Sequence, residues 1–504
     1  MNMFNSQRST PLYLFAIVCS LLLSAWINYS ESVINPDAVC YLYSAEEFAS
    51  SGLKAAMQLC PQAIWPFYSA LIEWIVKLTH LSYLHAAFTL DALLSALSVS
   101  MFIAIVKALG ASRRVLWLAA IVILFSHQFN ILRQDIVRDH GFWAFYLASV
   151  YLLLKFFKQP TLTNAWGWSI SLMVSTLFRV EGALFLGLLP FLAWLHSSFT
   201  FRERAYLFLK LNSVLLLGFG GVCVWLCLHP QQSYSLGRIS EISLQLQEGF
   251  AMLSQQMSLM KTAISQHILT HLSLRDANSV VILLLLSWYT VIVVSNISLL
   301  YTLLVLYAWF TQAASFTRSS FSVIFAYLFI NVGITLIFFA EHQFLAKRYL
   351  VALTLIVMLW IPFALEKCIV MTRHRVLKMG LLVWFSVVAM SGIIPFGYSK
   401  RYIHEAGDWL AANVPPTAQL YVNDYQLMYY SRHFGKTIFT KQQVYNDVKT
   451  IAQGKWKQYD YVALLKSNDP NDVAARIMQE IHLMPTQVFY NRNGDQVYIY
   501  KISH

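Results

Sequence analysis

The chain has 504 residues, of which 58% are hydrophobic and only 12% are charged, and its mean hydropathy is +0.55. Soluble domains average about 45–50% apolar and about 25% charged residues, so this composition excludes an ordinary soluble enzyme. The net charge is +12, but the last 108 residues hold 12 basic and 9 acidic side chains, a far higher charge density than the rest of the chain. The sequence therefore predicts a membrane domain over residues 1–396 and a water-soluble domain over residues 397–504.

Apolar runs long enough to cross a membrane recur along the first domain. A spanning helix needs about 20 residues, and such runs occur at 11–28, 85–106, 115–129, 141–157, 205–228, 321–340, 349–365 and 380–396. The run 162–195 is interrupted by Arg179 and Glu181, which predicts two short helices meeting at this charged pair. The run 280–310 is long for one span and is either one helix or two. The first run is too long for the apolar core of a signal peptide, so we expect a retained span.

The basic residues of the membrane domain indicate its orientation. With a cytoplasmic N-terminus and 11 spans, the cytoplasmic loops hold 14 basic and 2 acidic residues, whereas the outer side holds 10 basic and 13 acidic residues. This asymmetry follows the positive-inside rule. The positive surplus is therefore a topology signal, and we expect no nucleic-acid partner. The C-terminal domain is predicted to lie outside, although changing the assignment of 162–195 or 280–310 alone would move it to the cytoplasm.

Two long outer segments, 29–84 and 230–278, carry apolar residues at helical spacing, which is typical of helices lying on a membrane surface. The first contains Cys40 and Cys60, which are candidates for a disulfide in an oxidising compartment. The C-terminal domain is predicted to be α/β, with helices at 405–413, 426–431 and 473–482, strands at 419–422 and 459–465, and a hairpin of 488–490 with 496–500. It carries no nucleotide-binding, zinc or nucleophile motif, so we interpret it as a lid or recognition module.

Asn35-Pro36-Asp37 directly follows the first span. Asp37 has two interpretations that do not exclude each other. Aspartate is a favoured helix N-cap. A carboxylate just outside a span can also accept the proton of a hydroxyl or amine that attacks an activated substrate.

Charged residues also gather in the shorter outer turns. Lys347 and Arg348 open a span, where such side chains either extend to the interface or hold an anion. Arg138 lies in the turn 133–143, which is either an ion-paired helix cap or part of a cavity. For Arg179 and Glu181, an unpaired charge inside an apolar run costs at least about 2.5–3.5 kcal/mol, so we expect the two to be paired. They either line a cavity or only stabilise the chain reversal.

The order of several short motifs resembles a known superfamily. They are Pro36-Asp37 followed by aromatic residues and Ala45-Glu46-Glu47-Phe48-Ala49, the amphipathic segment 65–72, Ala108-Leu109-Gly110, and Lys347-Arg348-Tyr349-Leu350. This order resembles the GT-C superfamily of polytopic glycosyltransferases, and most of all the branch of bacterial aminoarabinose lipid A transferases and protein O-mannosyltransferases. The resemblance implies a mainly α fold of about 11 spans with a small C-terminal α/β domain.

The resemblance also implies a reaction. A sugar would move, with inversion, from a polyprenyl-phosphate carrier to a lipid, glycan or protein acceptor on the periplasmic face of a bacterial inner membrane. Asp37 would be the catalytic base, without a cofactor and without a metal. Family members often have Asp-Glu at this position, whereas Ala38 follows Asp37 here. Either Glu46, Glu47, Asp135 or Asp139 supplies the second acid, or the second acid is dispensable. The residues expected to bind substrate are Arg348, Lys347, Tyr349, His342, Arg138, Asp139, Arg179, Glu181 and Tyr41.

Two other functions remain alternatives. A transporter or flippase of a lipid-linked glycan is expected to show two related halves and broken helices near the midplane. The sequence shows no paired halves, and only the break at Arg179 fits this alternative. A non-catalytic membrane scaffold would use the C-terminal domain for binding and would not depend on Asp37.

Overall fold

The structure, a computed structural model, describes residues 10–30, 33–195, 200–228, 238–371, 375–394, 397–431, 454–467 and 481–502, with 474, 477 and 478. The chain divides into two compact units. Unit 1 comprises Met1–Leu23, Ala92–Leu132 and Arg138–Ile393, and unit 2 comprises Ser24–Asp91, Arg133–Val137 and Ile394–His504. The outer segment after the first span thus belongs to the same unit as the C-terminal domain. The division into a membrane domain of residues 1–396 and a water-soluble domain of residues 397–504 stays a prediction.

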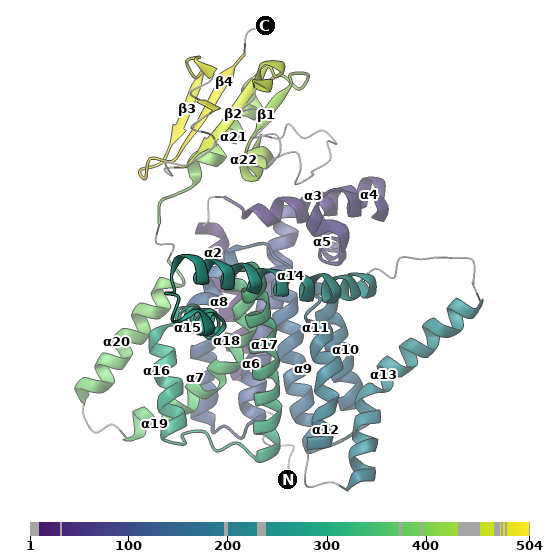
Figure 1. The fold of residues 1–504 in the computed structure, drawn as a ribbon. Helices are drawn as coiled ribbons and strands as arrows, with labels where there is room; N and C mark the ends of the chain where they lie inside the picture. Colours follow the sequence, from purple (N-terminus) through teal and green to yellow (C-terminus); the bar gives the residue numbers. More distant parts are fainter. Residues whose placement is uncertain are drawn as a thin grey trace. The chain divides into compact units, whose positions relative to one another are not determined.

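Unit 1 is helical throughout its described residues. Its helices are α2 (Thr10–Ser30), α6 (Tyr83–Ala108), α7 (Arg113–Leu124), α8 (His127–Ile131), α9 (Asp139–Lys158), α10 (Leu162–Phe178), α11 (Gly182–Leu188), α12 (Leu192–Leu195), α13 (Phe201–Leu228), α14 (Arg238–His267), α15 (Ala277–Ile297), α16 (Leu299–Phe310), α17 (Arg318–His342), α18 (Val351–Val357), α19 (Ile361–Met371) and α20 (Arg375–Ser391). Residues 24–30 of α2 and 83–91 of α6 belong to unit 2. Short 3-10 turns connect some of the helices: η2 (Leu132–Gln134), η3 (Leu189–Phe191), η4 (Leu274–Asp276), η5 (Lys347–Leu350) and η6 (Met358–Trp360). Helix α9 packs against both α10 and α17, and the three run side by side (Figure 1).

Among the described residues, six helices are long and apolar enough to cross a membrane: Thr10–Ser30, Tyr83–Ala108, Asp139–Lys158, Leu274–Ile297, Arg318–His342 and Lys347–Val370. A seventh candidate is the pair Arg113–Leu124 and His127–Gln134, which is bent by 46°. The count of 11 spans therefore stays a prediction. Both suspected breaks are present: α10 and α11 meet at Arg179–Glu181, and the run 280–310 forms two helices that part at Ser298, where φ is 77°.

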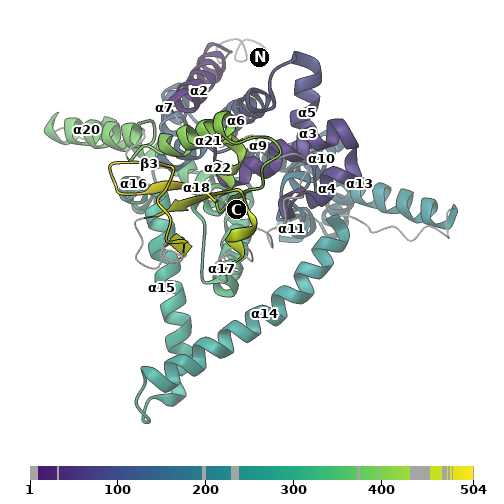
Figure 2. The ribbon, with the colours of Figure 1, turned by 90° about the horizontal axis from the view of Figure 1, so that it is seen from above.

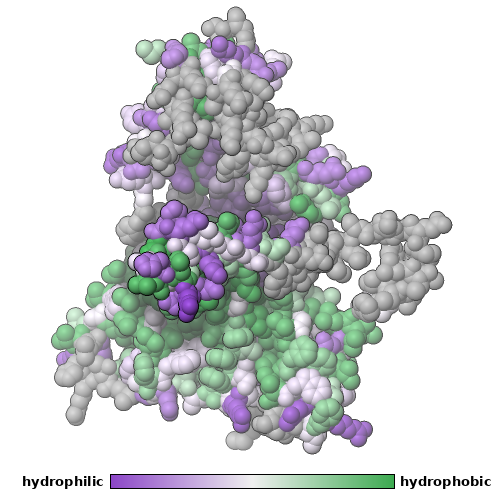
Figure 3. All heavy atoms as spheres, in the orientation of Figure 1, coloured by the Kyte–Doolittle hydropathy of each residue, from purple (hydrophilic) through white to green (hydrophobic). Residues whose placement is uncertain are grey.

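The helix faces at the periphery of unit 1 are apolar. Leu283 on α15, Phe329 on α17 and Val387 on α20 are mostly exposed, and Figure 3 shows apolar side chains over this part of unit 1. Large exposed apolar patches are rare on soluble proteins, so these faces are suited to lipid. The protein is an integral membrane protein. Helix α14 lies crosswise to α9, α10 and α17 and meets α15 at the rim of this unit (Figures 1 and 2), as expected for a surface-lying segment.

Unit 2 combines the first outer segment with the C-terminal α/β domain. Its elements are α3 (Pro36–Ser51), α4 (Leu53–Gln58), η1 (Pro61–Ile64), α5 (Phe67–Thr79), α21 (Arg401–Asn413), β1 (Leu420–Val422), α22 (Tyr425–Tyr430), η7 (Lys455–Gln458), β2 (Tyr461–Lys466), β3 (Gln487–Tyr490) and β4 (Gln496–Lys501). The sheet has the order β1-β2-β4-β3, with β1 parallel to β2 and the other pairs antiparallel. The predicted hairpin is confirmed as β3–β4. Part of the predicted helix 473–482 lies outside the described residues, and Ala474, Ile477 and Ile481 pack into the core beside the sheet.

Helix α22 packs against the outer segment that carries Asp37. The Gln426 side-chain amide donates to the Ile34 carbonyl, and the Ile34 N–H donates to the Tyr430 hydroxyl at 3.0 Å. Asp424 caps α22 by accepting from the Gln426 and Leu427 N–H groups at 2.9 Å, while burial raises the pKa of its carboxyl. The C-terminal domain therefore supports the start of α3 directly.

Candidate functional site

Asp37 lies in the first turn of α3 and is not its N-cap. Asn35 occupies the cap position, yet its side chain makes no capping bond. Instead its amide donates to the Ile136 carbonyl at 3.3 Å and accepts from the Ile136 N–H at 2.8 Å. The interpretation of Asp37 as the N-cap is therefore wrong. A carboxylate in the first turn of a helix interacts favourably with the helix dipole.

Three further contacts hold the helix that carries Asp37. The Gln62 amide donates to Asp37 Oδ1 at 3.3 Å. A disulfide joins Cys40 to Cys60, so the expected candidates are paired. The ring of Tyr41 is buried and meets Tyr68 edge to face at 5.0 Å. Asp37 is thus partly exposed and lies on a helix that these contacts hold in place.

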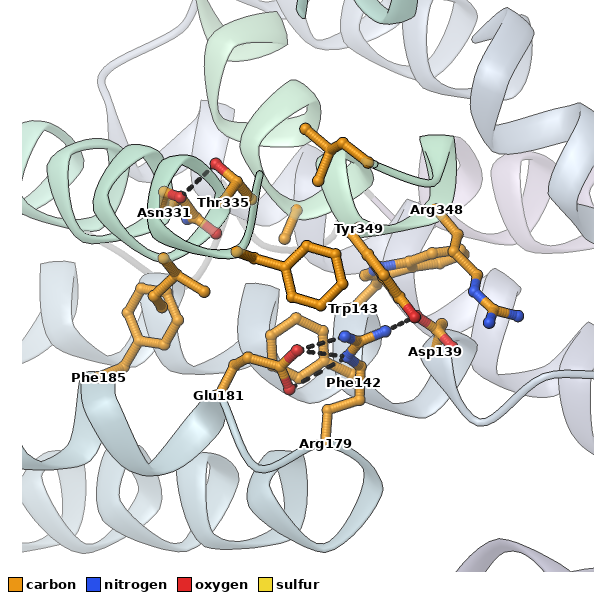
Figure 4. Close-up of a pocket in the computed structure, with 14 residues that line it drawn as sticks. Asp139, Phe142, Trp143, Arg179, Glu181, Phe185, Asn331, Thr335, Arg348 and Tyr349 are labelled. Carbon is orange, nitrogen blue, oxygen red and sulfur yellow. Dashed lines mark hydrogen bonds and ion pairs between the residues drawn. The ribbon is translucent and has the colours of Figure 1, made fainter. Parts of the chain in front are cut away.

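A pocket in unit 1 gathers five of the residues expected to bind substrate. Its empty space, including the part open to solvent, amounts to about 450 Å³. Asp139, Arg179, Glu181, Arg348 and Tyr349 line it (Figure 4). Its other walls come from Phe142, Trp143, Phe185, Asn331, Ile334, Thr335, Phe338, Leu345 and Ala352. A largely apolar pocket with a few converging polar groups is the usual form of a ligand site.

Asp139, Arg179 and Glu181 form an ion-paired triad in the pocket lining. Arg179 donates to Asp139 and, through Nε, to Glu181 Oε1 at 3.1 Å and Oε2 at 3.2 Å (Figure 4). The Asp139 side chain is only 4% exposed, that of Arg179 13% and that of Glu181 24%. Buried charges persist only when they are paired, so the predicted pairing of Arg179 with Glu181 is present and includes Asp139 as well.

Local backbone features bring the triad together. Asp139 opens α9, while Arg179 ends α10 in extended backbone and Glu181 begins α11. Two glycines allow the close approach: a Cβ on Gly141 would lie 2.3 Å from the Phe178 ring, and one on Gly182 would lie 2.7 Å from the Thr176 nitrogen. A larger residue at either position would push α9 or α11 away from α10.

Tyr349 lies between two cations. Its ring centroid is 4.4 Å from the Arg179 guanidinium carbon and 5.4 Å from that of Arg348. These distances are typical of cation–π contacts, which orient a guanidinium without neutralising it. The positive charge of Arg348 also acts on Asp139. The pocket therefore balances two arginines, Arg179 and Arg348, against two carboxylates, Asp139 and Glu181.

The other expected residues lie elsewhere. Lys347 and His342 are exposed, and the His342 ring stacks on Phe338 at 4.3 Å. Arg138 precedes α9 outside the pocket lining, though its charge acts on Asp139. Asp37 and Tyr41 belong to unit 2. The sequence reasoning missed Asn331, Thr335 and the aromatic walls. The one available signal was an asparagine inside the apolar run 321–340, because polar groups inside a span are costly.

The fold is GT-C-like, as the resemblance predicted: it matches the folds of solved membrane glycosyltransferases. ArnT of Cupriavidus metallidurans, solved with undecaprenyl phosphate bound, matches with a TM-score of 0.55 at 14% identity, over 97% of this chain and 98% of that one. The arabinofuranosyltransferase AftD from Mycobacteria matches at 0.51 and 13% identity over 98% of this chain, which spans 42% of AftD. The Archaeoglobus fulgidus oligosaccharyltransferase, solved with Zn and sulfate, matches at 0.55 and 12% identity, over 90% of this chain and 67% of that one.

A sequence comparison matches part of the chain to a protein family. Residues 13–180, one third of the sequence, match the family of dolichyl-phosphate-mannose-protein mannosyltransferases. No curated protein matches the chain. The matched region contains Asp37, Asp139 and Arg179.

Proposed function

We propose that the chain is a membrane glycosyltransferase that takes a sugar from a polyprenyl-phosphate carrier. The observation that carries the proposal is the pocket in which Arg348 and Arg179 flank Tyr349, in a fold shared with a transferase solved with undecaprenyl phosphate. Arginine forms strong charge-assisted hydrogen bonds to phosphate, so this pocket suits the phosphate of such a carrier. The family match over residues 13–180 supports sugar transfer from a lipid phosphate.

In the proposed reaction, Asp37 accepts the proton of the acceptor's hydroxyl or amine as that atom bonds to the anomeric carbon. The bond from the anomeric carbon to the phosphate oxygen breaks, and the electron pair leaves on polyprenyl phosphate. Attack opposite to the leaving group inverts the anomeric configuration. Arg348 stabilises the charge that develops on the departing phosphate, which is the term that usually lowers such barriers most.

The remaining assignments belong to the same proposal. The acceptor is a lipid, glycan or protein on the periplasmic side of a bacterial inner membrane, where the C-terminal domain of residues 397–504 also lies. Lys347 and Arg138 assist by drawing the anionic carrier toward the pocket. Neither a metal nor a cofactor takes part.

The test combines a deletion with one matched pair of variants. Mass spectrometry of envelope glycans and lipids, with and without this chain, should reveal one species that lacks a sugar mass after deletion. The wild-type chain and Asp408→Asn, an exposed aspartate of α21, should restore that species. Asp37→Asn should lower the transfer rate about 10²- to 10⁴-fold, the usual contribution of a general base.

Two outcomes would contradict the proposal in different ways. Near-normal transfer by Asp37→Asn would remove Asp37 as the base while leaving glycosyl transfer intact. An envelope unchanged by deletion, in cells shown to make the chain, would remove glycosyl transfer altogether.

A further inference from the structure

One end of the pocket presents two polar side chains, Asn331 and Thr335, among aromatic walls. Asn331 on α17 is 4% exposed and lines the pocket. Figure 4 shows Asn331, Thr335 and Phe185 at one end, and Arg348 with Asp139 at the other. A ligand that fills the pocket would therefore meet different chemistry at its two ends.

The orientation of the Asn331 amide follows from its partners. Its nitrogen donates to the Tyr327 carbonyl at 2.8 Å and to the Tyr146 hydroxyl. A backbone carbonyl can only accept a hydrogen bond, so the NH₂ group must face it, and both of its hydrogens are then in use. Oδ1 consequently points away from these partners, and no hydrogen-bond donor from the described part of the chain reaches it.

Neighbouring groups hold this amide rigidly. The Tyr327 hydroxyl bonds to Ser149 at 2.8 Å and accepts from the Trp168 indole at 3.1 Å. The Phe185 ring stacks on Tyr327 at 5.5 Å. Such support positions Oδ1 in advance, which lowers the entropic cost of binding.

Thr335 already has two hydrogen-bond partners at this end, whereas Asn331 Oδ1 has none among the described residues. The Thr335 hydroxyl donates to the Asn331 carbonyl at 2.7 Å and pairs with the Tyr289 hydroxyl, also at 2.7 Å. The apolar side chains of Phe142, Phe185, Ile334 and Phe338 supply most of the remaining wall. Among the described lining residues at this end, Asn331 Oδ1 is therefore the acceptor without a hydrogen bond and the first candidate to recognise a ligand.

Because Oδ1 can only accept a hydrogen bond, two parts of the lipid-linked sugar are unsuited to lie against it. An alkyl tail would leave Oδ1 buried without a hydrogen bond, which is unfavourable. A phosphate oxygen would meet the lone pairs of Oδ1 and be repelled. A ring hydroxyl satisfies Oδ1, and its ring can lie against the aromatic walls while its phosphate extends toward Arg348.

We propose that Asn331 recognises a hydroxyl group of the donor's sugar, so that this end of the pocket is the sugar subsite. The proposal rests on the proposed function, because it presumes a sugar linked to a lipid phosphate. A site built to bond a hydroxyl discriminates strongly against an analogue that lacks it, since its own polar group is then left unpaired. Asn331 is thus a specificity-determining residue.

The test measures binding to the full-length chain in lipid nanodiscs by native mass spectrometry. The probes are undecaprenyl phosphate alone, undecaprenyl phosphates carrying a hexose or a pentose, and the monodeoxy counterparts of each. For the wild type, one monodeoxy probe should bind about 10- to 100-fold more weakly than its parent, as expected when one buried acceptor loses its partner.

Three variants assign this preference to Asn331. Asn331→Leu keeps the branched shape but has no polar atom, so parent and deoxy probes should bind it equally, while undecaprenyl phosphate alone binds as to the wild type. Asn331→Asp keeps the shape and, with its carboxyl protonated toward the Tyr327 carbonyl, still has an acceptor oxygen for the ligand, so it should retain the preference. Tyr146→Phe removes one partner of the amide but leaves Oδ1, so it controls for general loosening of the network. If Asn331→Leu does not fold, Asn331→Ala replaces it with the same expectation.

The outcomes distinguish failure of the proposed role of Asn331 from failure of the proposed glycosyltransferase function. A preference retained in Asn331→Leu, or an equal loss of undecaprenyl phosphate alone, overturns the role of Asn331 only. A wild-type chain that binds none of the sugar-bearing probes overturns both proposals.

Discussion

Substitutions in the Asp139–Arg179–Glu181 triad are expected to lower the free energy of unfolding by different amounts. Removing one partner of a buried ion pair typically costs about 3–5 kcal/mol of unfolding free energy. Asp139→Asn should cost about 3 kcal/mol, the low end of that range, because Glu181 still pairs with Arg179. Glu181→Gln should cost about 1.5 kcal/mol, since its side chain is 24% exposed and water replaces part of the lost bond. Arg179→Met should cost about 5 kcal/mol, because it leaves two carboxylates facing each other.

The triple variant provides the sharpest check on this reasoning. Combining Arg179→Met with Asp139→Asn and Glu181→Gln removes every charge of the triad, so it should be more stable than Arg179→Met alone. Thermal unfolding of the full-length chain in nanodiscs, followed by tryptophan fluorescence, measures the order. Asp408→Asn, on the exposed face of α21, is the control and should change stability by no more than about 0.5 kcal/mol.

The refuting results are specific. If Asp139→Asn were no less stable than Glu181→Gln, burial would not govern the strength of these pairs. If the triple variant were no more stable than Arg179→Met, the cost would arise from lost packing of the guanidinium and not from unpaired carboxylates.

Two further predictions follow from the contacts around the two candidate sites. Tyr349→Leu should weaken binding of undecaprenyl phosphate about 2- to 30-fold, because the ring that orients Arg179 and Arg348 is lost, whereas Tyr349→Phe should bind normally; equal binding by the leucine variant would contradict this. Replacing Cys40 and Cys60 together by serine should cost about 3 kcal/mol of stability, and a reductant should lower the melting temperature of the wild type but not of this variant. A wild type unaffected by reductant would speak against that role of the disulfide.

The sequence by itself determined the class of fold and the main breaks in its helices. Apolar length is a local property, so the runs at 11–28, 85–106 and 321–340 correspond closely to α2, α6 and α17. The break at Arg179 was equally visible, because a charge cannot remain in an apolar run without a partner. The hairpin β3–β4 followed from alternation on either side of a turn sequence. Asp37 stood out by its position directly after the first span, the resemblance strengthened its assignment as the base, and that role remains a prediction.

Only the tertiary structure decided which groups meet. Arg179 pairs with Glu181 two residues away, which the sequence could suggest, but also with Asp139, 40 residues earlier, which it could not. Asn331 became a candidate only once Tyr146 and Tyr327 were seen to use both amide hydrogens. Periodicity and charge bias indicate which face of a helix meets lipid or water. A pocket depends instead on which helices pack together and at what register. That choice is made by close approaches such as Gly141 against Phe178, which no local pattern records.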